Sequence, residues 1–134
     1  KYNFGHVSSI LQISADNIHF PQSDNDLEKI DVQIKALDSL SLLNKENSGI
    51  TLLKLDVQGY ELEVLKGAEE TLKNIDYIVI EANLEQLYTN QPSLNQMYYY
   101  LDSKGYEIKG MLDFNLGNGN KYIEIDLLFS KKAK

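Results

Sequence analysis

Two apolar runs with a helical pattern between them restrict the folds open to this chain more than any other feature. The first run covers residues 51–57, and the second, Asp76–Ala82, is rich in β-branched side chains. Continuous apolar runs of this length are typical of strands covered on both faces. Tyr60–Asn74 has the amphipathic spacing of a helix. Strand, helix and strand with short links predict a βαβ unit, in which the two strands are parallel.

The flanking segments predict further elements. Ile30, Val32 and Ile34 alternate with polar residues, which is the period of a half-buried strand. Residues 38–43 predict a short helix with Asp38 as its N-cap.

The C-terminal third predicts one helix and a hairpin. The helix covers residues 93–104, with Ser93 as its cap and Gly105 as its stop. Residues 106–112 and 122–130 predict strands joined by a glycine-rich link, which favours an antiparallel hairpin. The fold class is therefore α/β, with a mostly parallel sheet and an antiparallel C-terminal hairpin.

Composition predicts one domain spanning residues 1–134. The chain is 43% hydrophobic and has only two prolines, as expected of a compact fold. It has no cysteine, which excludes a disulfide scaffold and a thiolate metal site. No apolar run approaches the roughly 18 residues of a membrane span, so we expect no membrane partner and a cytoplasmic location.

The charge balance argues against nucleic-acid partners. All 13 basic residues are lysine, and 20 carboxylates give a formal net charge of -7. Nucleic-acid binding generally needs a positive patch, preferably with arginine forks, and neither is present. We expect a neutral, hydroxylated small molecule as the ligand.

Two carboxylates end the two predicted parallel strands. Asp56 and Glu81 both lie at the carboxyl edge of the sheet, where open α/β sheets bind ligands. They are candidates for one shared site, and the alternative is that each caps a helix. Lys54 lies on the same strand face as Asp56, and we favour an ion pair there over a catalytic lysine.

Other polar residues give weaker signals. His6 and His19 lack the spacing of metal ligands, and we predict no metal site. Ser8 and Ser9 follow Gly5 and are candidates for ligand contact, although serine pairs are common in loops.

The central stretch resembles a known family. Residues 52–68, LLKLDVQGYELEVLKGA, followed by the run that ends at Glu81, closely resemble the hallmark of FkbM-type methyltransferases. The resemblance extends to residues 32–40, to Ser8-Ser9 and to Tyr106 after Gly105. It implies a Rossmann-like class I methyltransferase sheet. It also implies S-adenosylmethionine as cofactor and methyl transfer to a hydroxyl of a sugar or small metabolite.

The resemblance also implies roles for single residues. Asp56 would lie near the reacting methyl group and orient or deprotonate the acceptor hydroxyl. Glu81 would line the acceptor side, Glu61 would fix the turn and contribute to the acceptor site, and Lys54 would tune the carboxylates. Ser8 and Ser9, with Asp56, would contact the cofactor.

One part of the family pattern is not found. The first strand, its glycine-rich turn and the acidic residue for the ribose, which hold the cofactor, normally precede Ser8-Ser9. We therefore expect the C-terminal portion of the domain, inactive alone, with the N-terminal cofactor half missing. The two interpretations are an incomplete O-methyltransferase and a noncatalytic α/β binding or assembly module. Either leaves a sheet edge at Leu53 and Leu55 that favours a homo-oligomer.

Overall fold

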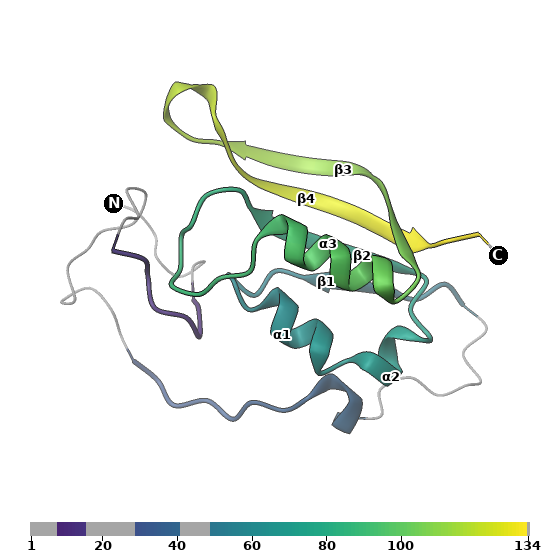
Figure 1. The fold of residues 1–134 in the computed structure, drawn as a ribbon. Helices are drawn as coiled ribbons and strands as arrows, with labels where there is room; N and C mark the ends of the chain where they lie inside the picture. The colour runs from purple at the N-terminus through teal and green to yellow at the C-terminus, as the bar shows by residue number, and fades with distance from the viewer. Residues whose placement is uncertain (1–7, 16–28, 41–48, 134) are drawn as a thin grey trace.

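The computed structural model describes residues 8–15, 29–40 and 49–133, and shows helices packed on one side of a four-stranded sheet (Figure 1). In chain order the elements are η3 (Leu37–Leu40), β1 (Leu52–Leu55), α1 (Glu61–Lys66), α2 (Glu69–Leu72), β2 (Tyr77–Asn83), α3 (Leu94–Ser103), β3 (Tyr106–Leu116), η4 (Asn118–Asn120) and β4 (Tyr122–Lys131). No helix in these ranges is long and apolar enough to cross a membrane.

The strand order is β1-β2-β4-β3. β1 and β2 are parallel, with Leu55 opposite Ile80, so the predicted βαβ unit is confirmed. β3 and β4 form the predicted antiparallel hairpin. The hairpin's second strand, β4, lies between β2 and β3 and is antiparallel to both. The described sheet is therefore mixed, and the mostly parallel sheet predicted from the sequence is not what these residues form.

The predicted helix over residues 60–74 is broken at Gly67 into α1 and α2. A close crossing of the preceding segment explains the break. The carbonyl of Gly67 accepts a hydrogen bond from the Asp38 N–H at 3.0 Å. A Cβ atom at Gly67 would lie only 3.4 Å from the Ala36 Cα.

Asp38 caps a different helix from the one predicted. Its carboxylate accepts hydrogen bonds from the Glu70 and Thr71 N–H groups, at 3.0 and 2.8 Å, in the first turn of α2. Asp38 itself lies in η3, and residues 41–43 of the predicted short helix are outside the described residues.

The predicted strand around Ile30, Val32 and Ile34 is wrong. Residues 29–36 form no regular element, and these three side chains are exposed. The alternating pattern correctly described an extended chain, but no described strand lies beside it to complete a ladder.

The core lies between the helices and one face of the sheet. That face includes Ile78, Ile80 and Ala82 of β2 and Phe129 of β4, all buried against Leu65, Leu72, Met97 and Leu101 of the helices. The helix predicted over residues 93–104 is confirmed as α3, with a Ser93–Gln96 capping box and with Met97 and Leu101 buried. On β1, Leu55 is buried and Leu53 half-buried, whereas Leu52 and Lys54 are exposed. The expectation that β1 is covered on both faces, and that its open edge exposes Leu55, is therefore wrong.

Candidate functional site

A tight turn links the end of β1 to the start of α1. Gln58 and Gly59 both adopt positive φ, at 52° and 93°. One carboxylate oxygen, Glu61 Oε1, accepts hydrogen bonds from the N–H groups of Val57 and Gly59, each at 3.1 Å. Glu61 is only 1% exposed, so its carboxylate fixes the turn from inside. This agrees with the turn-fixing role that the resemblance implied for Glu61.

The turn aims the Gln58 side chain between the two predicted carboxylates. Gln58 Nε2 donates to Asp56 Oδ1 at 3.1 Å and to Glu81 Oε1 at 2.8 Å. Tyr88 Oη donates to Gln58 Oε1 at 2.8 Å, which fixes the orientation of the amide. The structure thus brings Asp56 and Glu81 together at the carboxyl edge of the parallel pair, through one bridging amide.

Burial and neighbouring charge raise the pKa of Glu81 to about 7. Removal from water is the largest cause, followed by repulsion from the carboxylates of Glu124, Asp56 and Asp126. β4 supplies two of these neighbours, because Asp126 lies opposite Glu81 and Glu124 lies opposite Asn83 in the ladder. A carboxyl group with a pKa near neutrality can take up or release a proton under physiological conditions.

Burial also raises the pKa of the Tyr88 hydroxyl, as do the charges of Glu81 and Glu61. Tyr88 therefore stays protonated and keeps its donor role toward Gln58. Burial raises the pKa of Glu61 as well, although the hydrogen bonds from backbone N–H groups act in the opposite direction.

Lys54 pairs with Asp56, as predicted, but at the surface. Its Nζ lies 3.4 Å from Asp56 Oδ2, and the two side chains are 55% and 41% exposed. An exposed pair of this kind contributes little to stability. The Lys54 amine is therefore an exposed partner of Asp56 and is not buried in the strand.

Ser9 contacts the turn. Its hydroxyl donates to the Gln58 carbonyl at 2.6 Å and accepts from the Leu11 N–H at 3.0 Å. Ser8 is exposed. His6 and His19 lie outside the described residues.

The environment of Gly59 bears on cofactor binding. A Cβ atom there would lie 3.1 Å from side-chain carbons of Leu11 and Tyr88, and 3.3 Å from Gln91 Cβ. Protein atoms thus fill the space that a glycine turn would offer to a bound group. The Ser9 hydroxyl is likewise engaged with the protein. The described residues around this turn do not fit the methionine and ribose groups of S-adenosylmethionine, and we derive no reaction step through that cofactor.

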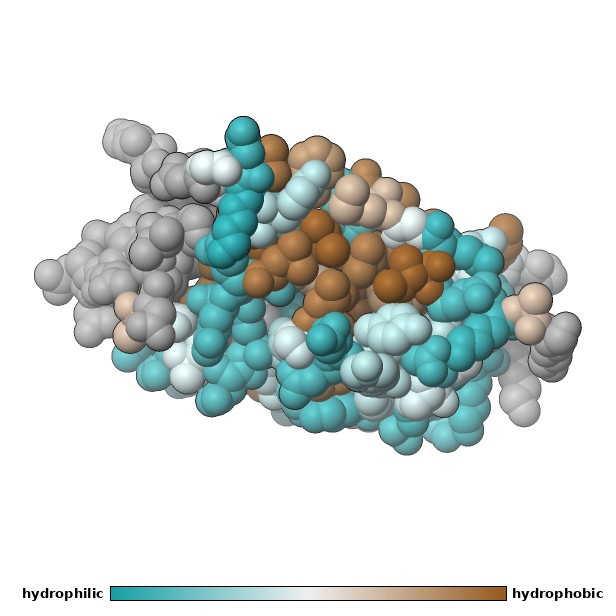
Figure 2. All heavy atoms as spheres, turned by 45° about the horizontal axis from the view of Figure 1, so that its top comes forward, coloured by the Kyte–Doolittle hydropathy of each residue, from teal (hydrophilic) through white to brown (hydrophobic). Residues whose placement is uncertain are grey.

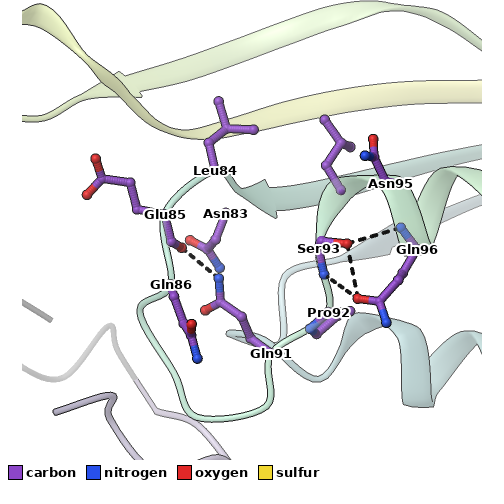
Figure 3. A pocket seen from close by; sticks show the side chains of 10 residues that line it. Asn83, Leu84, Glu85, Gln86, Gln91, Pro92, Ser93, Asn95 and Gln96 are labelled. Carbon is purple, nitrogen blue, oxygen red and sulfur yellow. Dashed lines mark hydrogen bonds between the residues drawn. The ribbon is translucent and has the colours of Figure 1, made fainter. Parts of the chain in front are cut away.

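A pocket opens where β2 ends and α3 begins (Figure 3). It is lined mainly by uncharged polar side chains: Asn83, Gln86, Gln91, Ser93, Asn95 and Gln96. Several of these are engaged in holding the walls. Gln91 Nε2 donates to the Glu85 carbonyl at 2.6 Å, and Ser93 and Gln96 form the capping box of α3.

Asn83 differs from the other pocket residues. It is 6% exposed, and its Oδ1 has no hydrogen-bond partner. A buried acceptor without a donor is costly, so Asn83 is a candidate to receive a hydrogen bond from a bound hydroxyl or amine. It lies two residues after Glu81, on the same face of β2.

Three site residues were not predicted from the sequence: Gln58, Tyr88 and Asn83. The position of Asn83, two residues beyond a candidate carboxylate on one strand, was a usable signal. The sequence gives no signal for Gln58 beyond its place in the turn. It gives none for Tyr88, which lies 30 residues further along the chain. Within the described ranges, no group of three or more acidic or histidine side chains is arranged to hold a metal ion.

Comparison with known proteins points to one family. A family model described as the methyltransferase FkbM domain matches residues 4–108. No curated protein and no solved structure matches the chain significantly. The matched range includes the β1–α1 turn, β2 with Glu81 and Asn83, and all of α3.

Proposed function

The chain belongs to the FkbM methyltransferase family, and we propose that it forms the acceptor side of an S-adenosylmethionine-dependent O-methyltransferase. The acceptor in this proposal is a hydroxyl of a sugar or other small metabolite. The fold proposed with it is the C-terminal portion of a Rossmann-like class I sheet. The described β1 and β2 supply its parallel strands, and β3 and β4 supply its reversed hairpin.

The bridge from Gln58 to both Asp56 and Glu81 is the observation that carries the proposal. It holds two carboxylates beside each other at the edge where open α/β sheets bind ligands. Glu81, with its pKa near 7, is the better general base, because half of it is ionised at neutral pH and ready to take the acceptor's proton. Asp56 orients the hydroxyl, and Lys54 offsets part of the charge that accumulates at this edge.

Asn83 extends the proposed site beyond the carboxylates. Its unpaired Oδ1 suits a donor on the acceptor molecule, such as a second hydroxyl. Neutral amide and hydroxyl side chains make up most of the polar lining of the neighbouring pocket, with Glu85 as its one charged residue, and they favour an uncharged ligand. This agrees with the lack of arginine, which disfavours phosphorylated or carboxylate-rich substrates.

Cofactor binding needs more than the described residues offer. We expect these 134 residues alone to show no binding of S-adenosylmethionine at millimolar concentration and no methyl transfer. Any longer natural form of the protein that adds a glycine-rich turn and an acidic residue for the ribose should bind the cofactor and transfer the methyl group. Methyl transfer depends mainly on holding the reacting atoms in line, so such a form should be sensitive to the positioning of its acceptor.

The test measures transfer of a radiolabelled methyl group to a panel of sugars and hydroxylated metabolites. It compares the chain with any longer natural form of the protein, and Glu81→Gln with Asp56→Asn in whichever form is active. Both substitutions should lower turnover at least about tenfold, within the usual range for a lost general base or orienting group. Glu70→Gln is the matched control, since Glu70 lies on α2 and forms a surface ion pair with Lys73. Full activity of Glu81→Gln would remove the general base from the proposal.

Calorimetry separates the catalytic proposal from its alternative. Micromolar binding of S-adenosylmethionine to these 134 residues would contradict our assignment of the main cofactor contacts to other elements. Absence of methyl transfer to every acceptor in the longer form would favour the noncatalytic binding or assembly module.

A further inference from the structure

The outer edge of β3 carries the longest row of backbone groups that the described sheet leaves unpaired. β3 runs for 11 residues, Tyr106–Leu116, and pairs with β4 on one side only. None of the described residues pairs with its other side. β1, the opposite edge strand, has only four residues. A long, uncovered edge strand is a template for pairing with another strand.

This edge is also apolar. Ile108, Met111 and Phe114 lie opposite Phe129, Leu127 and Ile125 of β4, and so share the sheet face that the helices cover. The helices leave them incompletely covered, and they remain 43%, 51% and 43% exposed. Figure 2 shows apolar side chains gathered on the side of the molecule that carries the hairpin. Apolar side chains on the core face of the sheet are therefore partly exposed along β3.

The sequence of β3, YEIKGMLDFNL, is complementary to itself when it runs antiparallel to a second copy. With Met111 opposite Met111, Lys109 lies opposite Asp113, and Ile108 lies opposite Phe114. The two-fold symmetry repeats each of these contacts. A shift that sets Glu107 opposite Asp113 would place like charges together, so charge favours the register centred on Met111.

We propose that β3 pairs antiparallel with β3 of a second copy of this chain, about a two-fold axis at Met111. The pairing extends the sheet across both copies and joins their two apolar stripes of Ile108, Met111 and Phe114. Because each copy uses its only long free edge in the described sheet, the assembly closes as a dimer.

Charge exchange across the two-fold axis tests this register directly. Lys109→Asp sets Asp opposite Asp113 in both halves of the interface, and Asp113→Lys sets two lysines opposite each other. Each variant alone should raise the dimer dissociation constant at least tenfold. An equimolar mixture restores both opposite-charge pairs and should dimerise near the wild-type concentration. Sedimentation velocity over about 1–100 μM measures each case, and circular dichroism checks that the variants remain folded.

Met111→Lys provides a second test, because it places two ammonium groups at the two-fold axis. Leu52→Lys is its matched control: Leu52 is also an exposed apolar strand residue, but on β1. Met111→Lys should give a monomer, and Leu52→Lys should leave the dimer intact. A wild-type monomer at 100 μM would overturn the proposal. So would a dimer that only Leu52→Lys dissociates, or a mixture of charge variants that stays monomeric.

Discussion

Replacing Glu61 with alanine tests how the β1–α1 turn is held. One oxygen of this buried carboxylate accepts both the Val57 and the Gly59 N–H, each at 3.1 Å. Within this turn Gln58, which is not a glycine, adopts a φ of 52°, a conformation that residues with a Cβ atom disfavour. Glu61→Ala leaves both N–H groups without this acceptor.

The loss of stability in Glu61→Ala depends on how deeply each of the two N–H donors is buried. A buried donor without a partner costs about 1–3 kcal/mol, and this applies fully to Gly59. Val57 is only half-buried, so water can replace part of its lost bond. Removing a carboxylate whose pKa burial has raised returns some free energy. We therefore expect Glu61→Ala to lower the free energy of unfolding by about 2–3 kcal/mol.

Urea unfolding followed by circular dichroism measures this loss. Glu61→Gln is the control, because its amide oxygen can replace Oε1 as acceptor for both N–H groups, and it should lose about 1 kcal/mol or less. A Glu61→Ala variant within about 0.5 kcal/mol of wild type would refute the reasoning. It would mean that solvent or a changed turn satisfies the two donors at no cost.

Substitutions at three further positions give distinct outcomes. Glu81 has a raised pKa, so the stability it contributes is present below its ordinary pKa of 4.5 and is lost as pH rises through about 7. Glu81→Gln should therefore remove up to about 3 kcal/mol of pH dependence from urea unfolding between pH 4.5 and 8, and an unchanged profile would contradict the assignment. Tyr106→Phe removes a buried hydroxyl whose single proton is shared between the Leu72 and Ile75 carbonyl oxygens, at 2.7 and 2.8 Å, and should lower the free energy of unfolding by about 1–2 kcal/mol in the same assay. Asp38→Ala removes the cap of α2 and should cost about 1 kcal/mol, whereas Asp38→Asn should retain most of the stability; equal losses would argue against capping.

Local periodicity predicted the elements whose partners lie nearby in the sequence. The βαβ unit, α3 with its Ser93 cap, and the hairpin all follow from runs, caps and turns within about 30 residues. The break at Gly67 was not predictable in this way. It depends on Ala36 and Asp38, which reach the helix from a segment about 30 residues earlier.

Strand order limited the prediction of the sheet. The sequence correctly indicated a hairpin, but nothing in β4 itself says that it pairs with β2 on its other side. For Ile30, Val32 and Ile34, alternation predicted a strand where no described partner strand exists. Alternation reports which side chains suit a strand, and pairing depends on the rest of the fold.

The candidate site was predicted only in outline. Asp56 and Glu81 were found because each ends an apolar run, and parallel strands bring such ends together. Gln58, which links them, and Tyr88, which orients that amide, depend on the positive φ of the turn and on the loop after β2. These contacts join distant segments, so no spacing in the sequence reveals them.

The central claim is that burial and the surrounding carboxylates make Glu81 a base poised near neutral pH, and that Gln58 holds this side chain in place. Carbon-13 NMR titration of the Glu81 carboxyl carbon measures this directly in the folded chain. The structure leads us to expect a pKa of about 7, and a lower value in Asp56→Asn, where one repelling charge is gone. A Glu81 carboxyl group that titrates near its ordinary 4.5, or a pKa that Asp56→Asn leaves unchanged, would contradict the account.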